Sequence, residues 1–149
     1  MNAMDLLFRT ERFNLSKVGE HFINPCCFGE DLARWLSDKL QEKGVAVSEP
    51  YQEDWGWELP ASGPSGSYYL CLSGNADEER ANPDLGEWRI IVVKKRSLKQ
   101  RILGQGVIQA DDAMIGLIVR ILKAEDRIRD VHFESDEVET RNSGLATRD

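Results

Sequence analysis

The chain has 149 residues, a formal net charge of −7, 41% hydrophobic residues and 30% charged residues. This balance is typical of a single folded domain and excludes an intrinsically disordered chain. The negative charge argues against binding to nucleic acid or to an anionic membrane, because both repel an acidic protein. The longest apolar run, Ile90–Val93, is far too short to span a membrane.

The cysteines and the N-terminal segment predict a reduced, cytoplasmic protein. The chain has three cysteines, and the adjacent pair Cys26 and Cys27 is poorly placed to form a disulfide with itself. Free thiols are typical of cytosolic proteins. Residues 1–13 contain no basic region followed by a long apolar run, so we expect no signal peptide.

In the first half of the chain, the apolar pattern predicts two strands and one helix. Loose alternation over Leu6–Leu15 indicates a strand. A helix is expected to begin at Asn24-Pro25 or at the rival start Gly29-Glu30-Asp31, and to end near Gly44. Its apolar residues recur at helical spacing: Leu32, Trp35, Leu36 and Leu40. Alternation over Trp55–Leu59 predicts a half-buried strand.

The middle of the chain predicts two further strands separated by polar loops. Residues 60–66 form a turn-rich segment, and Ser67–Ser73 is a strong strand. Residues 74–87 are polar and are expected to form a loop. Trp88–Lys95 is the strongest strand, and its centre is apolar on both faces, which favours a position in the middle of the sheet.

The C-terminal part predicts a second helix, a short strand and a tail. Asp111 is expected to cap the helix, and Ile128–Phe133 is a candidate strand. The helix has one apolar stripe: Met114, Leu117, Ile118, Ile121 and Leu122. Residues 134–149 contain almost no apolar side chains and are predicted to be a disordered acidic tail.

The predicted element order is β-α-β-β-β-α-β within a single domain over residues 1–133. Each helix has one apolar stripe and therefore needs one apolar sheet face. The simplest arrangement is an α+β two-layer sandwich, in which a mostly antiparallel sheet carries both helices on one face.

No motif in the sequence dictates a reaction. Cys26 or Cys27 near a helix N-terminus, with His21 as base, could support a cysteine-dependent enzyme. No catalytic cysteine signature surrounds them, and a free cysteine is more often a small buried apolar residue. The sequence has no CxxC or HxxxH spacing, and Gly104-Gln105-Gly106 matches no phosphate-binding loop. We therefore expect no metal and no cofactor.

The charges divide into two blocks. Residues 49–87 contain nine acids and one base, Arg80, whereas residues 88–110 contain six bases and no acid. The favoured interpretation is that the two blocks neutralise each other. The functional alternative is an acidic surface that binds a basic protein partner, as immunity or antitoxin-type proteins do.

The segment Glu53-Asp54-Trp55-Gly56-Trp57 offers a candidate ligand site. Two tryptophans at positions i and i+2 of a strand share one face, and the carboxylates of Glu53 and Asp54 adjoin them. Such an aromatic wall could hold a cation or an amphipathic ligand. The alternative is that both indoles belong to the core, in one cluster with Trp35.

The same segment takes part in a resemblance. Cys27–Leu36 (CFGEDLARWL), followed by Glu53–Trp57 (EDWGW), resembles a family of small bacterial proteins of unknown function over about the first 60 residues. The resemblance implies a bacterial, cytosolic, single-domain protein and no particular activity. It also implies that the first helix and the Trp55–Trp57 strand act together.

Three functional hypotheses follow. The first is a non-catalytic binding protein that engages a basic partner through its acidic block. The second is a small-molecule binding domain with a site at Glu53, Asp54, Trp55 and Trp57, and the third is the cysteine-dependent enzyme. The sequence makes no prediction of the oligomeric state.

Overall fold

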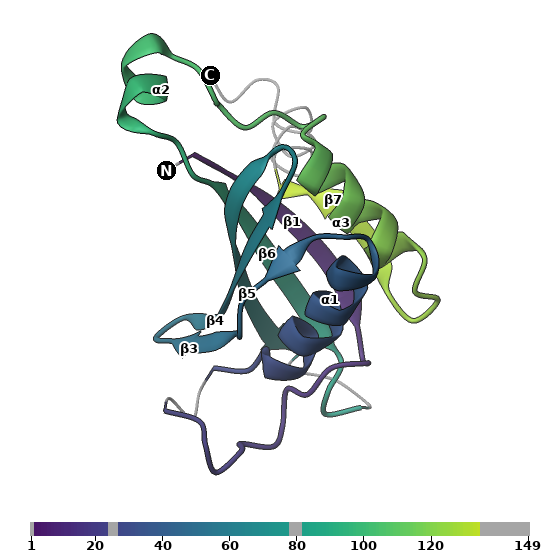
Figure 1. The fold of residues 1–149 in the computed structure, drawn as a ribbon. Helices are drawn as coiled ribbons and strands as arrows, with labels where there is room; N and C mark the ends of the chain where they lie inside the picture. The colour runs from purple at the N-terminus through teal and green to yellow at the C-terminus, as the bar shows by residue number, and fades with distance from the viewer. Residues whose placement is uncertain (1, 24–26, 78–81, 135–149) are drawn as a thin grey trace, which may run out of the picture.

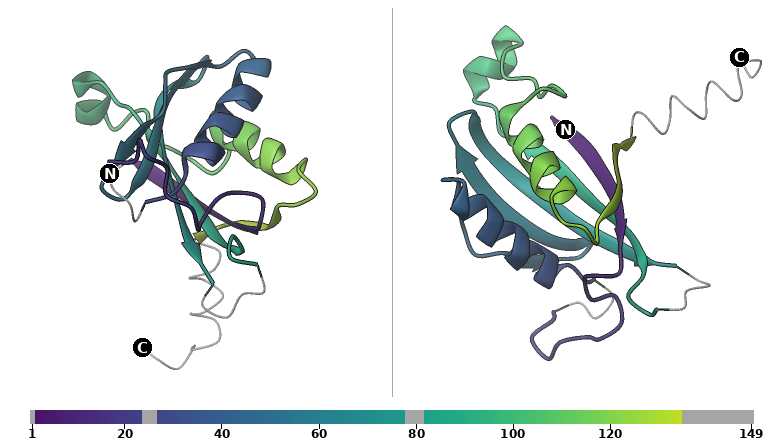
Figure 2. Two further views of the ribbon diagram at one scale, coloured as in Figure 1. Left: turned by 90° about the horizontal axis from the view of Figure 1, so that it is seen from below. Right: turned by 90° about the vertical axis from the view of Figure 1, so that its right-hand side faces the viewer.

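Seven antiparallel strands form one sheet, and two of the three helices cover one of its faces (Figures 1 and 2). The computed structural model describes residues 2–23, 27–77 and 82–134. The strands are β1 (Ala3–Thr10), β2 (Ala46–Val47), β3 (Tyr51–Glu53), β4 (Gly56–Gly63), β5 (Gly66–Ala76), β6 (Gly86–Lys94) and β7 (Arg129–Phe133). The helices are α1 (Glu30–Glu42), α2 (Leu98–Leu103) and α3 (Ala113–Lys123). The predicted α+β sandwich, with a helix layer on one face of an antiparallel sheet, is confirmed.

The strand order is β2-β4-β5-β6-β1-β7, and β3 also pairs with β4. Alternate residues of the long central strands point to the helix-covered face, and the most deeply buried include Leu70, Leu72, Ile90 and Val92. The apolar stripes of α1 and α3 pack against these residues in one core. The central position predicted for β6 is confirmed, since β6 lies between β5 and β1.

The residue before each of the two long helices explains where the helix begins. Of the two predicted starts, α1 uses Gly29, which has a φ of 138° and leads directly into Glu30 and Asp31. In α3 the cap is Asp112, one residue after the predicted Asp111, and its carboxylate accepts the backbone N–H of Met114.

Strand lengths differ from the sequence-based expectation. β1 ends at Thr10, five residues before the predicted end at Leu15. β4 continues through most of the expected loop 60–66 as far as Gly63, and β5 and β6 take residues from both ends of the expected loop 74–87. These extra residues are polar or small, but they are paired in the antiparallel ladder with neighbouring strands. Pairing with a neighbour therefore overrides the weak local strand preference of these segments.

The helix α2 is not predicted from the sequence, because it buries none of its residues and so has no apolar stripe facing the sheet. At the C-terminus, Glu134 was expected to begin the tail, but its carboxylate pairs with Arg89 on β6. The rest of the predicted tail, residues 135–149, lies outside the described residues. No helix in the described part of the chain is long and apolar enough to cross a membrane.

Candidate functional site

The predicted aromatic site lies in the hairpin between β3 and β4. Glu53 ends β3, Asp54 and Trp55 form the turn, and Trp57 lies in β4. The prediction that the two indoles share one face of a strand is wrong, because the strand begins only at Gly56. Trp55 is 45% exposed, whereas Trp57 is 4% exposed and belongs to the core.

Trp57 is held by the segment that leads into α1. Its indole N–H donates to the carbonyl of Cys27 over 3.1 Å, and the side chain of Gln52 donates to the same carbonyl. The thiol of Cys27 in turn donates to the carbonyl of Asp54. A side chain at Gly56 would lie 2.1 Å from the Leu72 carbonyl oxygen, so the space beside this glycine is already filled by β5. The two segments of the resemblance, Cys27–Leu36 and Glu53–Trp57, are therefore in contact, and the contact is tightly packed.

Of the three tryptophans expected in one cluster, Trp35 and Trp57 make ring contacts with different partners. Trp35 is half-buried and packs against Phe13 with ring centroids 5.5 Å apart. Trp57 instead contacts the rings of Phe22 and His21. The expectation of one three-indole cluster is therefore wrong.

The described cysteines have the environment of structural residues. Cys27 is buried and donates a hydrogen bond, whereas Cys26 lies outside the described residues. His21 pairs with Glu30. Burial, together with nearby carboxylates, raises the pKa of Cys71 to about 12, which keeps this thiol protonated at neutral pH.

Acids of the block 49–87 are engaged one by one with local partners. The partners are Arg34 for Glu49, the Tyr51 hydroxyl for Glu58, Arg9 for Asp77 and the backbone N–H of Leu15 for Asp84. These partners come from outside residues 88–110. Mutual neutralisation of the two blocks, which the sequence favoured, therefore does not describe Glu49, Asp77 and Asp84. Glu58 differs, because its carboxylate also interacts with the positive charge of Lys95 in the basic block.

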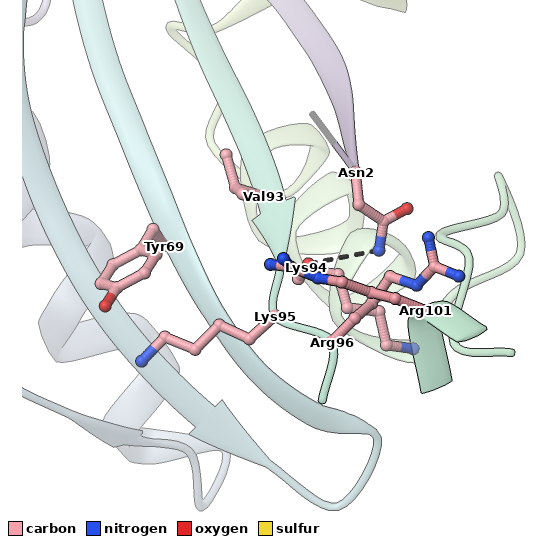
Figure 3. Close-up of a pocket in the computed structure, with 7 residues that line it drawn as sticks. All are labelled: Asn2, Tyr69, Val93, Lys94, Lys95, Arg96 and Arg101. Atoms are coloured by element: carbon pink, nitrogen blue, oxygen red, sulfur yellow. Dashed lines mark hydrogen bonds between the residues drawn. The ribbon is translucent and has the colours of Figure 1, made fainter. Parts of the chain in front are cut away.

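The basic block provides most of a cleft of about 770 Å³ beside the ends of β5 and β6 (Figure 3). Seven residues line it: Asn2, Tyr69, Val93, Lys94, Lys95, Arg96 and Arg101. Four of the seven are cationic and none is acidic. β6 and the segment after it supply three of these cations in a row, and α2 supplies Arg101.

One of the four cations is neutralised within the protein. The ammonium of Lys94 lies 2.8 Å from a carboxylate oxygen of Asp112, whose side chain is almost fully buried. The hydroxyl of Tyr68 also donates to this carboxylate. Burial alone would raise the pKa of Asp112, but hydrogen bonds led by that from Lys94 outweigh it and lower the pKa. This network fixes the start of α3 to the sheet, and Lys94 is its one member that lines the cleft.

The other three cations form no ion pair with a carboxylate of the described residues, although the positive charge of Lys95 acts on Glu58 and opposes the burial that raises the pKa of that carboxyl. The ammonium of Lys95 lies 4.2 Å from the ring centroid of Tyr69. The guanidinium of Arg96 donates to the backbone carbonyls of Gln100 and Gln105. No ion pair or side-chain hydrogen bond engages Arg101 within the described part of the chain. The cleft thus concentrates positive charge on a protein of net negative charge.

Asn2 fixes the mouth of the cleft. Its side-chain amide donates to the carbonyls of Lys94 and Gly106, and its side-chain oxygen accepts the N–H of Ile108 (Figure 3 shows the bond to Lys94). These bonds join the end of β6 to the segment that follows α2. The basic block was visible in the sequence, but the contributions of Asn2 and Tyr69 depend on pairing between distant strands.

The described residues contain no group of three or more His, Cys, Asp or Glu side chains arranged to hold a metal ion. Comparison of the chain with protein-family models, with curated proteins and with solved structures gave no match.

Proposed function

We propose that the chain is a non-catalytic binding protein whose basic cleft binds an anionic group of its ligand, a carboxylate or a phosphate. The observation that carries this proposal is that Lys95, Arg96 and Arg101 line one cleft and that no carboxylate of the described residues forms an ion pair with any of them. Uncompensated cations in a concave site attract anions, and guanidinium groups can bind a carboxylate or phosphate through paired hydrogen bonds.

The lining of the cleft is suited to binding an anion. Four of its seven residues are cations, and none is a histidine, cysteine, serine or carboxylate. The overall charge of −7 does not cancel the local field, because charges beyond about 8 Å are largely screened at physiological salt.

The test uses citrate and tripolyphosphate as probes, followed by calorimetry at low and high salt. We expect both probes to bind, and the double variant Lys95→Glu/Arg101→Glu to lose at least about tenfold in affinity, since this corresponds to about 1.4 kcal/mol. Arg120→Glu/Lys123→Glu, an equal charge change at two exposed positions of α3, is the control and should leave affinity nearly unchanged. Equal binding by the double variant and the wild type would refute the proposal.

A second candidate is supported by the exposed turn between β3 and β4. Trp55 is 45% exposed and adjoins the exposed Asp54, a combination suited to a cationic group on a small ligand or on a basic protein partner. Within this candidate, Trp57 serves as the buried support of the turn and Glu53 as its flanking carboxylate. Tetramethylammonium is the probe, and a tryptophan emission change that persists in Trp55→Ala would count against this site.

A further inference from the structure

The segment Ser97–Val107, here called the α2 arm, exposes apolar side chains without packing them on the core. Leu98 is 73% exposed, Ile102 74%, Leu103 55% and Val107 47%. Among the described residues, eight large apolar side chains are exposed, and half of them lie in this one short segment. Figures 1 and 2 show α2 projecting beyond the sheet, away from α1 and α3. A concentration of this kind marks an interaction surface.

The α2 arm is held in its conformation by local hydrogen bonds, because it buries no apolar side chains in the core. Ser97 and Gln100 form a reciprocal capping box at the start of α2, and Gly104 ends the helix with a φ of 66°. Arg96 donates to the carbonyls of Gln100 and Gln105, and Asn2 holds the end of the arm to β6. The arm is therefore ordered before a partner arrives, which lowers the entropy cost of binding.

The apolar face of the arm adjoins the cationic face of the cleft. Leu98 and Ile102 are four residues apart on α2, so their side chains are neighbours on one side of the helix. Arg101, three residues after Leu98, lies next to them and lines the cleft. Apolar and cationic contacts are thus available to one ligand at the same time.

We propose that the α2 arm and the basic cleft form one docking surface for an acidic segment of a partner protein. Carboxylates of that segment bind Lys95 and Arg101, while its apolar side chains cover Leu98 and Ile102. This proposal rests on the anion-binding function of the cleft and adds the class of ligand. Its support is charge complementarity, because no carboxylate among the described residues forms an ion pair with Lys95 or Arg101.

Other occupants fit the surface less well. A symmetric pair of copies would place the cations of one arm against those of the other, which is repulsive. A lipid bilayer is broad and flat, whereas the cationic residues here line a concave site. Single-stranded nucleic acid binds through aromatic stacking, but the exposed side chains of the arm are aliphatic and Lys95 already lies over Tyr69.

The test compares two fluorescein-labelled synthetic peptides of equal length and charge. Both are rich in glutamate, and they carry either serine or leucine at the intervening positions. Anisotropy titrations should show the leucine peptide binding wild-type protein about tenfold more tightly, the gain expected from partial burial of leucine against aliphatic side chains. The variant Leu98→Ser/Ile102→Ser should remove this difference and leave the affinity for the serine peptide unchanged. Val18→Ser, which alters an exposed apolar residue elsewhere, is the matched control.

The outcomes separate the docking surface from the cleft. If both peptides bind equally to wild type but lose affinity in Lys95→Glu/Arg101→Glu, the docking surface is refuted and the anion site stands. If neither peptide nor the small anions bind, both proposals fail. Binding of phosphatidylglycerol vesicles that depends on Leu98 and Ile102 would overturn the protein-segment proposal in favour of a lipid surface. Tighter binding of a single-stranded oligonucleotide than of the leucine peptide would overturn it in favour of nucleic acid.

Discussion

The β3–β4 turn and the α2 arm contrast in how their prominent side chains are used. The turn contains the aromatic and acidic pattern that stands out in the sequence, yet Trp57 is fixed by Cys27 and the space beside Gly56 is filled by β5. The α2 arm has no such pattern, yet it exposes apolar and cationic side chains together. Aromatic residues can bury large areas, and one of the two indoles of this motif, that of Trp57, is used in this way.

The largest expected change in stability is at Trp57, the buried indole of the turn. Trp57→Ala should lower the free energy of unfolding by about 3–5 kcal/mol, because it removes a large core side chain and leaves a cavity. Urea denaturation measures this change. Trp55→Ala is the control, and a loss close to that of Trp57→Ala would show that the turn depends equally on both indoles.

A smaller loss is expected where the cleft meets the core. Asp112→Asn should lower the free energy of unfolding by about 2 kcal/mol, because Lys94 and Tyr68 lose a charged hydrogen-bond partner. Because the pKa of Asp112 is lowered in the folded state, its contribution is present above the unfolded pKa near 3.9. It is lost as the pH falls through the lower folded value.

Urea denaturation of wild type and Asp112→Asn between neutral pH and pH 2 checks the sign of this effect. The difference in stability between the two proteins should be constant above pH 5 and should shrink below about pH 4. A difference that grows in acid would contradict the assigned direction of the pKa shift.

Much of this fold is predictable from the sequence because burial imposes periodicity. The stripe of α1, the central apolar run of β6 and the stripe of α3 all follow from packing against one core. An exposed element has no such apolar periodicity, and α2 is an example. Its capping box and its terminal glycine can be recognised in the sequence, but no periodic pattern of apolar residues between them indicates a helix. Strand ends such as Gly63 and Ala76 are set by the partner strand.

The candidate site was only partly predictable. Residues 88–110 could be recognised as a block of bases without an acid, and this block supplies all four cations of the cleft. Which of these cations form an ion pair could not be read in the same way, since it depends on which acids pair elsewhere in the fold: Lys94 pairs with Asp112, whereas Lys95, Arg96 and Arg101 form no ion pair among the described residues. The acids Glu49 and Asp77 pair with Arg34 and Arg9, which are distant in sequence.

Asn2→Ala tests whether the order of the α2 arm depends on its attachment to β6. The variant loses hydrogen bonds to Lys94, Gly106 and Ile108, and we expect the local free energy of opening to fall by about 1 kcal/mol. Hydrogen exchange of the Ile108 amide, which donates to Asn2, measures this directly. Unchanged exchange at Ile108 would show that the capping box and the Arg96 hydrogen bonds order the arm without Asn2.

The smallest expected change in stability is in the α2 arm, whose apolar side chains are exposed. Leu98→Ser/Ile102→Ser should change the free energy of unfolding by less than about 0.5 kcal/mol, because neither side chain contributes to the core. Thermal denaturation of the variant beside wild type measures it. A clear loss of stability would mean that Leu98 and Ile102 pack against the rest of the protein in solution and are therefore not available to a partner.

The place of β1 in the sheet has a consequence for how the protein is made. β1 is the first strand in the chain, yet its two neighbours are β6 and β7, which come many residues later. At usual rates of translation, both edges of β1 therefore wait on the order of ten seconds for their partners to be synthesised. During this interval the nascent chain presents an apolar strand with open backbone groups, so high-level expression should favour aggregation and slower synthesis should favour native protein.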